Sequence, residues 1–401
     1  MAGLSLRAWR ALVCIGFAAI VVAVVAVPYL GWIPGGSAAK RPTALYAAPD
    51  RWRLLLASFG DGAHGAVVMT QTSLIGDTYT TANAGRTWQA RHAGISGTTF
   101  LDRNHAIALD SQPERRLVST ANAGRTWVPM STPVMVQPVR LLLDRVSGGP
   151  VFIDPAHGWW LENLSPAHPL PVGLWRTRDG GRTWLPLSAT GLSSAMQLGQ
   201  VAFVDQVRGA ILCVSGPPGW PSLMTTRDGG ETWASTALPA SPTAGLSVPM
   251  TGADDVQLLT YGGRLLLSLT LVTSAGDELT RWASTSEDGG LTWTTWAREP
   301  DIVLLPFAAP LFDERGRLLL ADDQLLWTSS DYARTWHARA LSLPNGARAL
   351  TLVAARAGAV FIIAERRLSA SARGVALFRS LDAGDHWTEI HLPHEAGGAG
   401  S

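Results

Sequence analysis

Short apolar runs separated by turn residues recur along most of the chain. The clearest is Leu54–Phe59, followed by the turn Gly60–Gly65 and a second apolar run, Ala66–Met69. Runs of this length bounded by glycine and polar residues are typical of β-strands. Related copies are Phe100–His105, Phe152–Trp159 and Phe203–Gly209, with weaker ones at Phe312–Gly316 and Leu352–Phe361. After Leu30 no long amphipathic helical pattern occurs, which disfavours helical repeat folds.

A second pattern, of eight residues, stands after most of these runs: Ser/Thr, any, Asp/Asn, any, Gly, any, Thr, Trp. Its copies are Thr81–Trp88, Thr120–Trp127, Thr177–Trp184, Thr226–Trp233 and Ser286–Trp293, and two degenerate ones are Ser329–Trp336 and Ser380–Trp387. The closing tryptophans lie roughly fifty residues apart, a period typical of propeller blades or solenoid units. The repeat therefore predicts seven structural units.

The eight-residue pattern predicts a tight β-hairpin turn. We expect the carboxylate or amide at its third position to accept hydrogen bonds from backbone N–H groups two or three residues on, and its Gly to supply a positive φ. The closing Trp should begin the next strand and pack its indole on the blade. The third-position residues are Asn83, Asn122, Asp179, Asp228, Asp288, Asp331 and Asp382, and the tryptophans are Trp88, Trp127, Trp184, Trp233, Trp293, Trp336 and Trp387.

Each unit consists of strand, turn, strand, longer loop, strand, eight-residue turn, strand. Seven such units predict an all-β fold, a seven-bladed β-propeller of four-stranded antiparallel blades over residues 50–394. We expect residues 395–401 to be a disordered tail.

The N-terminus predicts export. Arg7 and Arg10 precede an uncharged stretch from Ala11 to Ala39, which is long enough for a transmembrane helix. Residues 1–34 are therefore predicted to form a cytoplasmic stub and a single membrane anchor, residues 35–49 a linker, and the propeller to lie on the extracytoplasmic side. A signal peptide cleaved near Ala39, giving a secreted protein, is the alternative.

Composition and net charge indicate a globular protein and disfavour nucleic-acid binding. Hydrophobic residues make up 47% and charged residues 16%, as in a globular protein with a large core. The formal net charge of +1 provides no field to hold nucleic acid. Cys14 and Cys213 form no disulfide framework.

The eight-residue turns resemble the Asp-box, or bacterial neuraminidase repeat, of sialidases, sortilin-type receptors and photosystem II stability and assembly factors. Phe152–Trp159 and the regular spacing look most like the assembly-factor family, and the resemblance covers about Ala44 to His394. It implies an extracytoplasmic platform that binds other proteins and carries no catalytic residues.

A sialidase-like glycosidase or a carbohydrate-binding propeller is the alternative. The sialidase resemblance would imply an Arg-Ile-Pro segment and a Tyr nucleophile paired with Glu. The chain has no such segment. Tyr46, Tyr79 and Tyr332 are poor candidates for a nucleophile, and Tyr261 is more typical of a blade residue.

We predict no metal site and no cofactor. The turn carboxylates lie on seven units around a ring and should not converge, although hard cations favour such ligands. His64, His105 and His157 recur at one position of the repeat, which is typical of a surface turn rather than of a metal triad.

Loops on the face opposite the Asp-box turns are the predicted binding surface, because loops on a rigid scaffold commonly carry binding residues. These loops include Leu161–Leu174, Ser215–Ser222 and Pro239–Pro249. The candidate binding residues are Trp160, His168 and Trp220. The expected partner is a protein, in or at a membrane complex.

Overall fold

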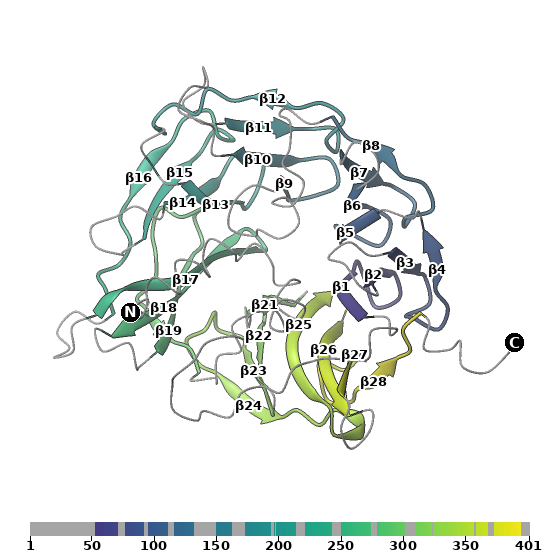
Figure 1. Ribbon diagram of the computed structural model, residues 1–401. Helices are drawn as coiled ribbons and strands as arrows, with labels where there is room; N and C mark the ends of the chain where they lie inside the picture. Colours follow the sequence, from purple (N-terminus) through teal and green to yellow (C-terminus); the bar gives the residue numbers. More distant parts are fainter. Residues whose placement is uncertain are drawn as a thin grey trace, which may run out of the picture.

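Seven four-stranded sheets stand side by side as the blades of a ring (Figure 1). The computed structural model describes residues 53–70, 77–91, 95–110, 116–131, 150–162, 173–193, 196, 198–213, 221–242, 250–273, 279–300, 310–313, 315–322, 324–356, 358–367 and 373–393. The predicted membrane anchor, linker and tail lie outside these residues. Among the described residues, no helix has the length and hydropathy needed to span a membrane.

Each blade is formed by four strands that follow one another in the sequence. Blade 1 consists of β1 (Arg53–Phe59), β2 (Gly65–Thr70), β3 (Asp77–Thr81) and β4 (Gln89–Arg91). Blade 2 consists of β5 (Ile95–Phe100), β6 (Ala106–Asp110), β7 (Arg116–Thr120) and β8 (Val128–Pro129). Blade 3 consists of β9 (Pro150–Phe152), β10 (Gly158–Glu162), β11 (Gly173–Thr177) and β12 (Leu185–Pro186). Blade 4 consists of β13 (Leu198–Phe203), β14 (Gly209–Cys213), β15 (Ser222–Thr226) and β16 (Ala234–Thr236).

The remaining blades have longer or shorter strands in the same order. Blade 5 consists of β17 (Met250–Tyr261), β18 (Arg264–Thr273), β19 (Leu279–Ser286) and β20 (Ala297–Arg298). Blade 6 consists of β21 (Leu311–Phe312), β22 (Leu318–Ala321), β23 (Leu325–Ser329) and β24 (His337–Ala340). A short 3-10 turn, Pro344–Gly346, precedes blade 7. Blade 7 consists of β25 (Arg348–Arg356), β26 (Ala359–Arg367), β27 (Arg373–Ser380) and β28 (Thr388–Ile390). The predicted propeller of seven antiparallel four-stranded blades is confirmed.

The strand order gives the ring two different faces. The first strand of each blade lies innermost and the fourth outermost (Figure 1). Because neighbouring strands are antiparallel, the first-to-second and third-to-fourth turns share one face, which we call the short-turn face. The second-to-third loops and the links between blades share the other, which we call the variable-loop face.

Aromatic residues at the ends of first strands join neighbouring blades. Phe203 of blade 4 stacks on Trp159 of blade 3, with ring centroids 3.7 Å apart and planes 6° from parallel. The same ring covers Gly209, where an added Cβ would lie 2.6 Å from Phe203 Cδ1. The glycine at this repeat position therefore leaves room for the ring, and the paired blades bury it almost completely.

The ring closes by side-chain packing between blade 7 and blade 1. No described strand is exchanged between the two blades. Phe59 stacks on Phe361 at 3.8 Å, and both belong to one buried cluster with residues of β1, β2, β26 and β27. The indole N–H of Trp88 donates to the carbonyl of His391 at 2.7 Å, and Arg379 donates to the carbonyl of Gly62 at 3.2 Å.

Candidate functional site

The eight-residue turns lie on the short-turn face, and the third strand of every blade ends at the first residue of its turn. In blade 3 the Thr177 hydroxyl donates to Asp179 Oδ1 at 2.9 Å and accepts from the N–H of Gly181 at 2.8 Å. Asp179 then accepts the Thr183 N–H at 2.9 Å and the Thr183 hydroxyl at 2.6 Å. A backbone donor four residues on, the N–H of Thr183, thus adds to the predicted donors two or three residues on. The predicted donor three residues on is present as well: Leu291 donates to Asp288 at 3.0 Å, and Arg182 and Glu231 contribute backbone hydrogen bonds to Asp179 and Asp228.

Asparagine builds the same turn in blades 1 and 2. Asn83 Oδ1 accepts from the Thr81 hydroxyl at 3.1 Å and from the Thr87 N–H at 2.9 Å. The Asn83 amide donates to the Thr87 hydroxyl at 2.8 Å. In blade 3 the direction is opposite, because the Thr183 hydroxyl donates to Asp179. Asn122 repeats this arrangement with Thr120 and Thr126. The turn therefore requires an acceptor at this position and no negative charge.

Two consecutive residues of the turn have positive φ, where the sequence predicted one. In blade 1 these are Ala84 at 63° and Gly85 at 80°. A Cβ on Gly85 would lie 2.1 Å from Ile390 of blade 7, so glycine is required for contact as well as conformation. In blade 6 the pair is Tyr332 and Ala333, at 60° and 67°. This non-glycine pair carries backbone strain.

The closing tryptophans pack between blades to different depths. Trp233 and Trp387 are 6% and 8% exposed, and their indoles donate to the glycine carbonyls of their own turns. Trp293 makes the same bond at 2.8 Å while half-buried. Trp88, Trp127, Trp184 and Trp336 are also half-buried.

The turn carboxylates are used within their own turns. Burial alone would raise the pKa of Asp228, but hydrogen bonds from the hydroxyl and N–H of Thr232 and the hydroxyl of Thr226 lower it to about 2. Asp288 shows the same balance, with its pKa lowered to about 2 by bonds from Thr292 and Ser286. Asp331 and Asp382 also have lowered pKa values. Among the described residues, no group of three or more His, Cys, Asp or Glu could hold a metal ion.

The recurring histidines form a second kind of turn beside the first. His64 Nδ1 lies 2.9 Å from Asp61 Oδ2, and His105 and His157 pair identically with Asp102 and Asp154. Each Asp also accepts two backbone N–H groups of its turn, as Asp61 does from Ala63 and His64. In blade 4 Arg208 takes the histidine's place beside Asp205.

The two kinds of turn are joined through the backbone. The N–H of Ala84 donates to the carbonyl of Ala63 at 2.8 Å, and equivalent bonds join the two turns in blades 2, 3 and 4. The first-to-second turns thereby cover the eight-residue turns in these blades. The sequence predicted the histidine-containing turns. It did not predict the backbone hydrogen bonds between the two turns, because these depend on no particular residue type.

Trp160 does not belong to a binding surface. It is 1% exposed and meets Trp184 edge-on, with centroids 5.6 Å apart. Both faces of a blade are covered by its neighbours, so consecutive aromatic residues Trp159 and Trp160 are both buried. This removes Trp160 from the candidate binding residues. His168 and Trp220 lie outside the described residues.

Blade 5 contains a buried ion pair that sequence reasoning missed. Arg281 Nε lies 2.9 Å from Glu299 Oε2, with side chains 2% and 0% exposed. Ser268 joins them, its hydroxyl donating to Glu299 Oε1 at 3.1 Å and accepting from Arg281 at 3.3 Å. Both charges lie at the strand ends toward the variable-loop face.

The tyrosines considered for a sialidase-like site are used in packing. Tyr79 is 9% exposed, and burial followed by the charge of Asp77 raises its pKa. Tyr261 stacks on Phe312 at 5.3 Å, which agrees with its expected role in a blade. Tyr332 lies under the guanidinium of Arg264, 4.2 Å from the ring centroid. Tyr46 lies outside the described residues.

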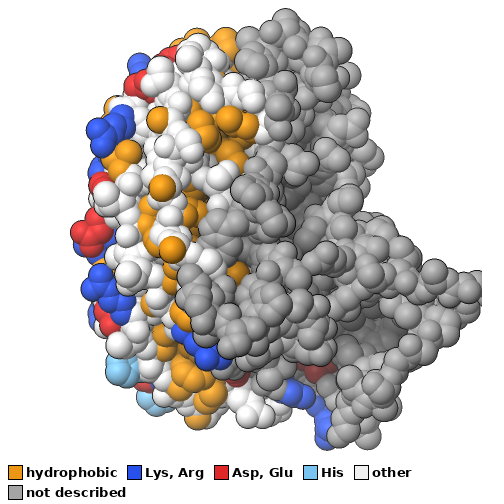
Figure 2. Space-filling model, turned by 90° about the vertical axis from the view of Figure 1, so that its left-hand side faces the viewer, with side chains coloured by type: hydrophobic (Ala, Val, Ile, Leu, Met, Phe, Trp, Pro, Cys, Tyr) orange, Lys and Arg blue, Asp and Glu red, His pale blue; other side chains and the backbone are white. Residues whose placement is uncertain are grey.

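Charged and apolar side chains occupy different parts of the described surface. Figure 2 shows charged side chains gathered along one edge, with hydrophobic side chains further along the flank. Exposed charged residues of the eight-residue turns include Arg178, Arg182, Arg227 and Glu287. Exposed apolar residues of the outer strands include Val128 and Leu185, at 53% and 55%.

Comparisons with known proteins support the fold. A scan of family models found no match, and neither did a search of curated proteins. Among solved structures, the β-propeller domain of the Trilobed protease from Pyrococcus furiosus, described as having an open velcro topology, is 7% identical with a TM-score of 0.51 and covers 85% of this chain and 98% of that chain. A structure from a study of two prolyl endopeptidases is 13% identical, with a TM-score of 0.51, covering 86% of this chain and 50% of that one.

A third match is to a structure described as YCF48 bound to D1 peptide. It is 16% identical with a TM-score of 0.45, and covers 84% of this chain and 96% of that chain. At these identities the comparisons establish the propeller architecture alone.

Proposed function

We propose that the chain is a membrane-anchored, extracytoplasmic propeller that binds a protein partner through its variable-loop face and catalyses no reaction. The contrast between the two faces carries the proposal. On the short-turn face the eight-residue turn recurs in every blade. On the other face, residues 92–94 link β4 to β5, whereas 130–149 link β8 to β9. Variable connections on a uniform rigid scaffold are where binding residues concentrate.

Strand direction supports the same face. β1 runs toward the short-turn face, since it ends in the turn that leads to β2, and β28 runs away from it. The described propeller therefore begins at Arg53 and ends near Ile390 on the variable-loop side. If residues 1–34 form the anchor, the short segment before Arg53 keeps this side near the membrane. A partner within a membrane complex would then face the variable loops.

Two measurements on whole cells test the proposal. Protease treatment of spheroplasts should digest the propeller, and the mature chain should fractionate with membranes. Protection of the domain would contradict export, while release into the soluble fraction would indicate cleavage near Ala39. A pull-down from solubilised membranes should recover a protein partner, and Trp220→Ala should weaken its binding by about 2 kcal/mol or more if this residue is an interface anchor.

Activity assays address the alternative. Purified protein should leave sialosides and other glycosides uncleaved. Cleavage that depends on a carboxylate of the variable-loop face would replace the binding proposal with a glycosidase.

A further inference from the structure

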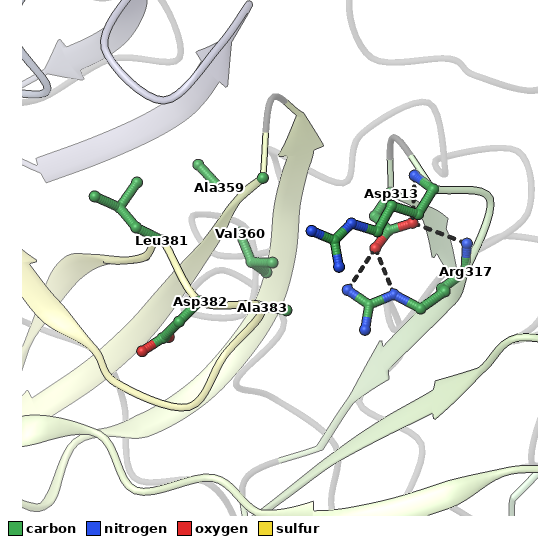
Figure 3. A pocket seen from close by; sticks show the side chains of 9 residues that line it. Asp313, Arg317, Ala359, Val360, Leu381, Asp382 and Ala383 are labelled. Carbon is green, nitrogen blue, oxygen red and sulfur yellow. Dashed lines mark hydrogen bonds and ion pairs between the residues drawn. The ribbon is translucent and has the colours of Figure 1, made fainter.

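A hollow on the short-turn face lies between blades 6 and 7. Its volume is about 180 Å³, and its lining includes Asp313, Arg315 and Arg317 of blade 6 and Ala359, Val360 and Leu381 of blade 7. Figure 3 shows Asp313 and Arg317 on one side, Leu381 and Asp382 on the other, and Ala359 and Val360 between them.

The hollow follows from a missing turn. In blades 1 to 4 the first-to-second turn reaches over the eight-residue turn and accepts a backbone N–H from it, as Ala63 does from Ala84. In blade 7, β25 ends at Arg356 and β26 begins at Ala359, so only two residues connect them. This connection is too short to cover the turn at Leu381 and Asp382.

Blade 5 has an equally short connection, and a charged side chain lies beside its eight-residue turn. The first residue of β18 is Arg264, whose guanidinium lies 4.2 Å from the centroid of Tyr332 and pairs with Glu287 at 3.1 Å. Blade 7 has Ala359 at the first position of β26. At the corresponding position blade 7 therefore has a methyl group where blade 5 has a guanidinium that pairs with its own eight-residue turn.

The carboxylates at the hollow are already bonded. Asp313 accepts the N–H groups of Arg315 and Arg317 at 2.9 and 2.8 Å and pairs with the Arg317 guanidinium at 2.7 Å. Asp382 accepts the hydroxyl of Ser380 at 2.7 Å and lies 2.6 Å from His386 Nδ1.

Two exposed side chains at the hollow can contact a ligand, the guanidinium of Arg315 and the side chain of Leu381. The exposed Arg315 forms no ion pair with any described residue. Leu381 is 62% exposed at the edge of the hollow, whereas Ala359 and Val360, which also line it, are buried. An arginine fork binds carboxylates well, and an adjacent apolar surface favours a ligand with an apolar group next to its charge.

We infer that this hollow binds a carboxylate carried next to an apolar side chain in a short peptide segment of a partner protein. The assignment of this ligand to a partner protein rests on the proposed protein-binding function. The volume is below the ~300–1,000 Å³ of typical small-molecule sites, so it suits one or two residues rather than a glycan chain. The carboxylate comes either from an Asp or Glu side chain or from a chain end.

Defined peptides titrated into the full chain, followed by ligand-observed NMR, test the site. The first is acetyl-Gly-Leu-Glu-Gly-amide, compared with its Gln counterpart, and the second is acetyl-Gly-Gly-Leu with a free or an amidated end. We expect the carboxylate form of at least one pair to bind about tenfold more tightly than its neutral counterpart. The pair that shows the difference identifies the carboxylate source.

Matched variants separate the site from general surface effects. Arg315→Gln and Leu381→Ser should each weaken binding about tenfold with unchanged melting temperature, because both side chains are exposed. The controls Arg334→Gln and Leu185→Ser change an exposed arginine and an exposed leucine outside the hollow and should leave binding unchanged. Equal binding of charged and neutral peptides, or equal losses in the controls, would overturn the inference.

A pull-down with the same variants distinguishes this inference from the proposed function. A partner recovered equally by the wild type, Arg315→Gln and Leu381→Ser would overturn the hollow as a contact for that partner, and would leave intact the proposal that the variable-loop face binds it. Peptide binding that depends on Arg315, without recovery of any membrane partner, would support the site and count against the proposed function.

Discussion

Phe59 and Phe361 stack with their ring planes 8° from parallel, although Phe59 belongs to the first blade and Phe361 to the last. Phe203 and Trp159 make the same contact, at 6°, across a junction whose blades are joined by a peptide link. Blades 7 and 1 thus meet through the ordinary packing of the repeat, and none of the described strands is shared between them.

Phe361→Ala should lower the free energy of unfolding by about 3–5 kcal/mol, because the ring is 0% exposed and its loss leaves a cavity. Phe203→Ala is the matched control at a linked junction. Hydrogen exchange should rise in β1–β4 and β25–β28 of the first variant, whereas the second should affect only blades 3 and 4. An equal rise in exchange, confined in each variant to the two blades at the altered junction, would show that the unlinked junction is no weaker than the linked one.

Trp233→Ala should destabilise the protein more than Trp184→Ala. Trp233 is 6% exposed and bonded to Gly230, whereas Trp184 is half-buried. We expect about 3–5 kcal/mol for the first and less for the second in urea unfolding. The reverse order would mean that the edge-on contact of Trp184 with Trp160 matters more than burial.

The buried pair in blade 5 predicts a compensated double variant. Arg281→Met leaves Glu299 buried without its partner and should cost about 3–5 kcal/mol. Adding Glu299→Leu removes the stranded charge and should restore most of that stability. Chemical unfolding of the two single variants and the double variant provides the measurement. Additive losses would show that the two charges do not depend on each other.

Acid should weaken the Asp-containing turns. The folded pKa of Asp228 is about 2, below its ordinary 3.8, so its stabilising contribution is present above about pH 4 and is lost as pH falls toward 2. Asp228→Asn should keep the turn, as Asn83 does, and should flatten the fall in melting temperature over this range. An unchanged acid profile would indicate that other carboxylates dominate it.

The repeat made the blade number predictable because each copy carries its own turn chemistry. Less was predictable where a contact joins distant residues. Trp160 was predicted as a binding residue, but both faces of its blade are covered by neighbouring blades, and Trp159 and Trp160 are both buried. Arg281 and Glu299 meet only after β19 and β20 pair.

The hollow beside Ala359 also depends on an arrangement that the sequence reveals only in part. In the sequence, the only indication of the hollow is the weak repeat copy Leu352–Phe361, which lacks the Asp-containing turn of the earlier units. That missing turn becomes a hollow only because Asp313 and Arg317 stand across from it.

Because every blade is one uninterrupted piece of chain, the position of the chain ends on the ring is arbitrary for its architecture. A circular permutant that starts at blade 2 and carries blade 1 after blade 7 would keep all seven sheets intact. Gain or loss of a whole unit would likewise change the circumference without dividing a sheet. The fold is in this sense modular.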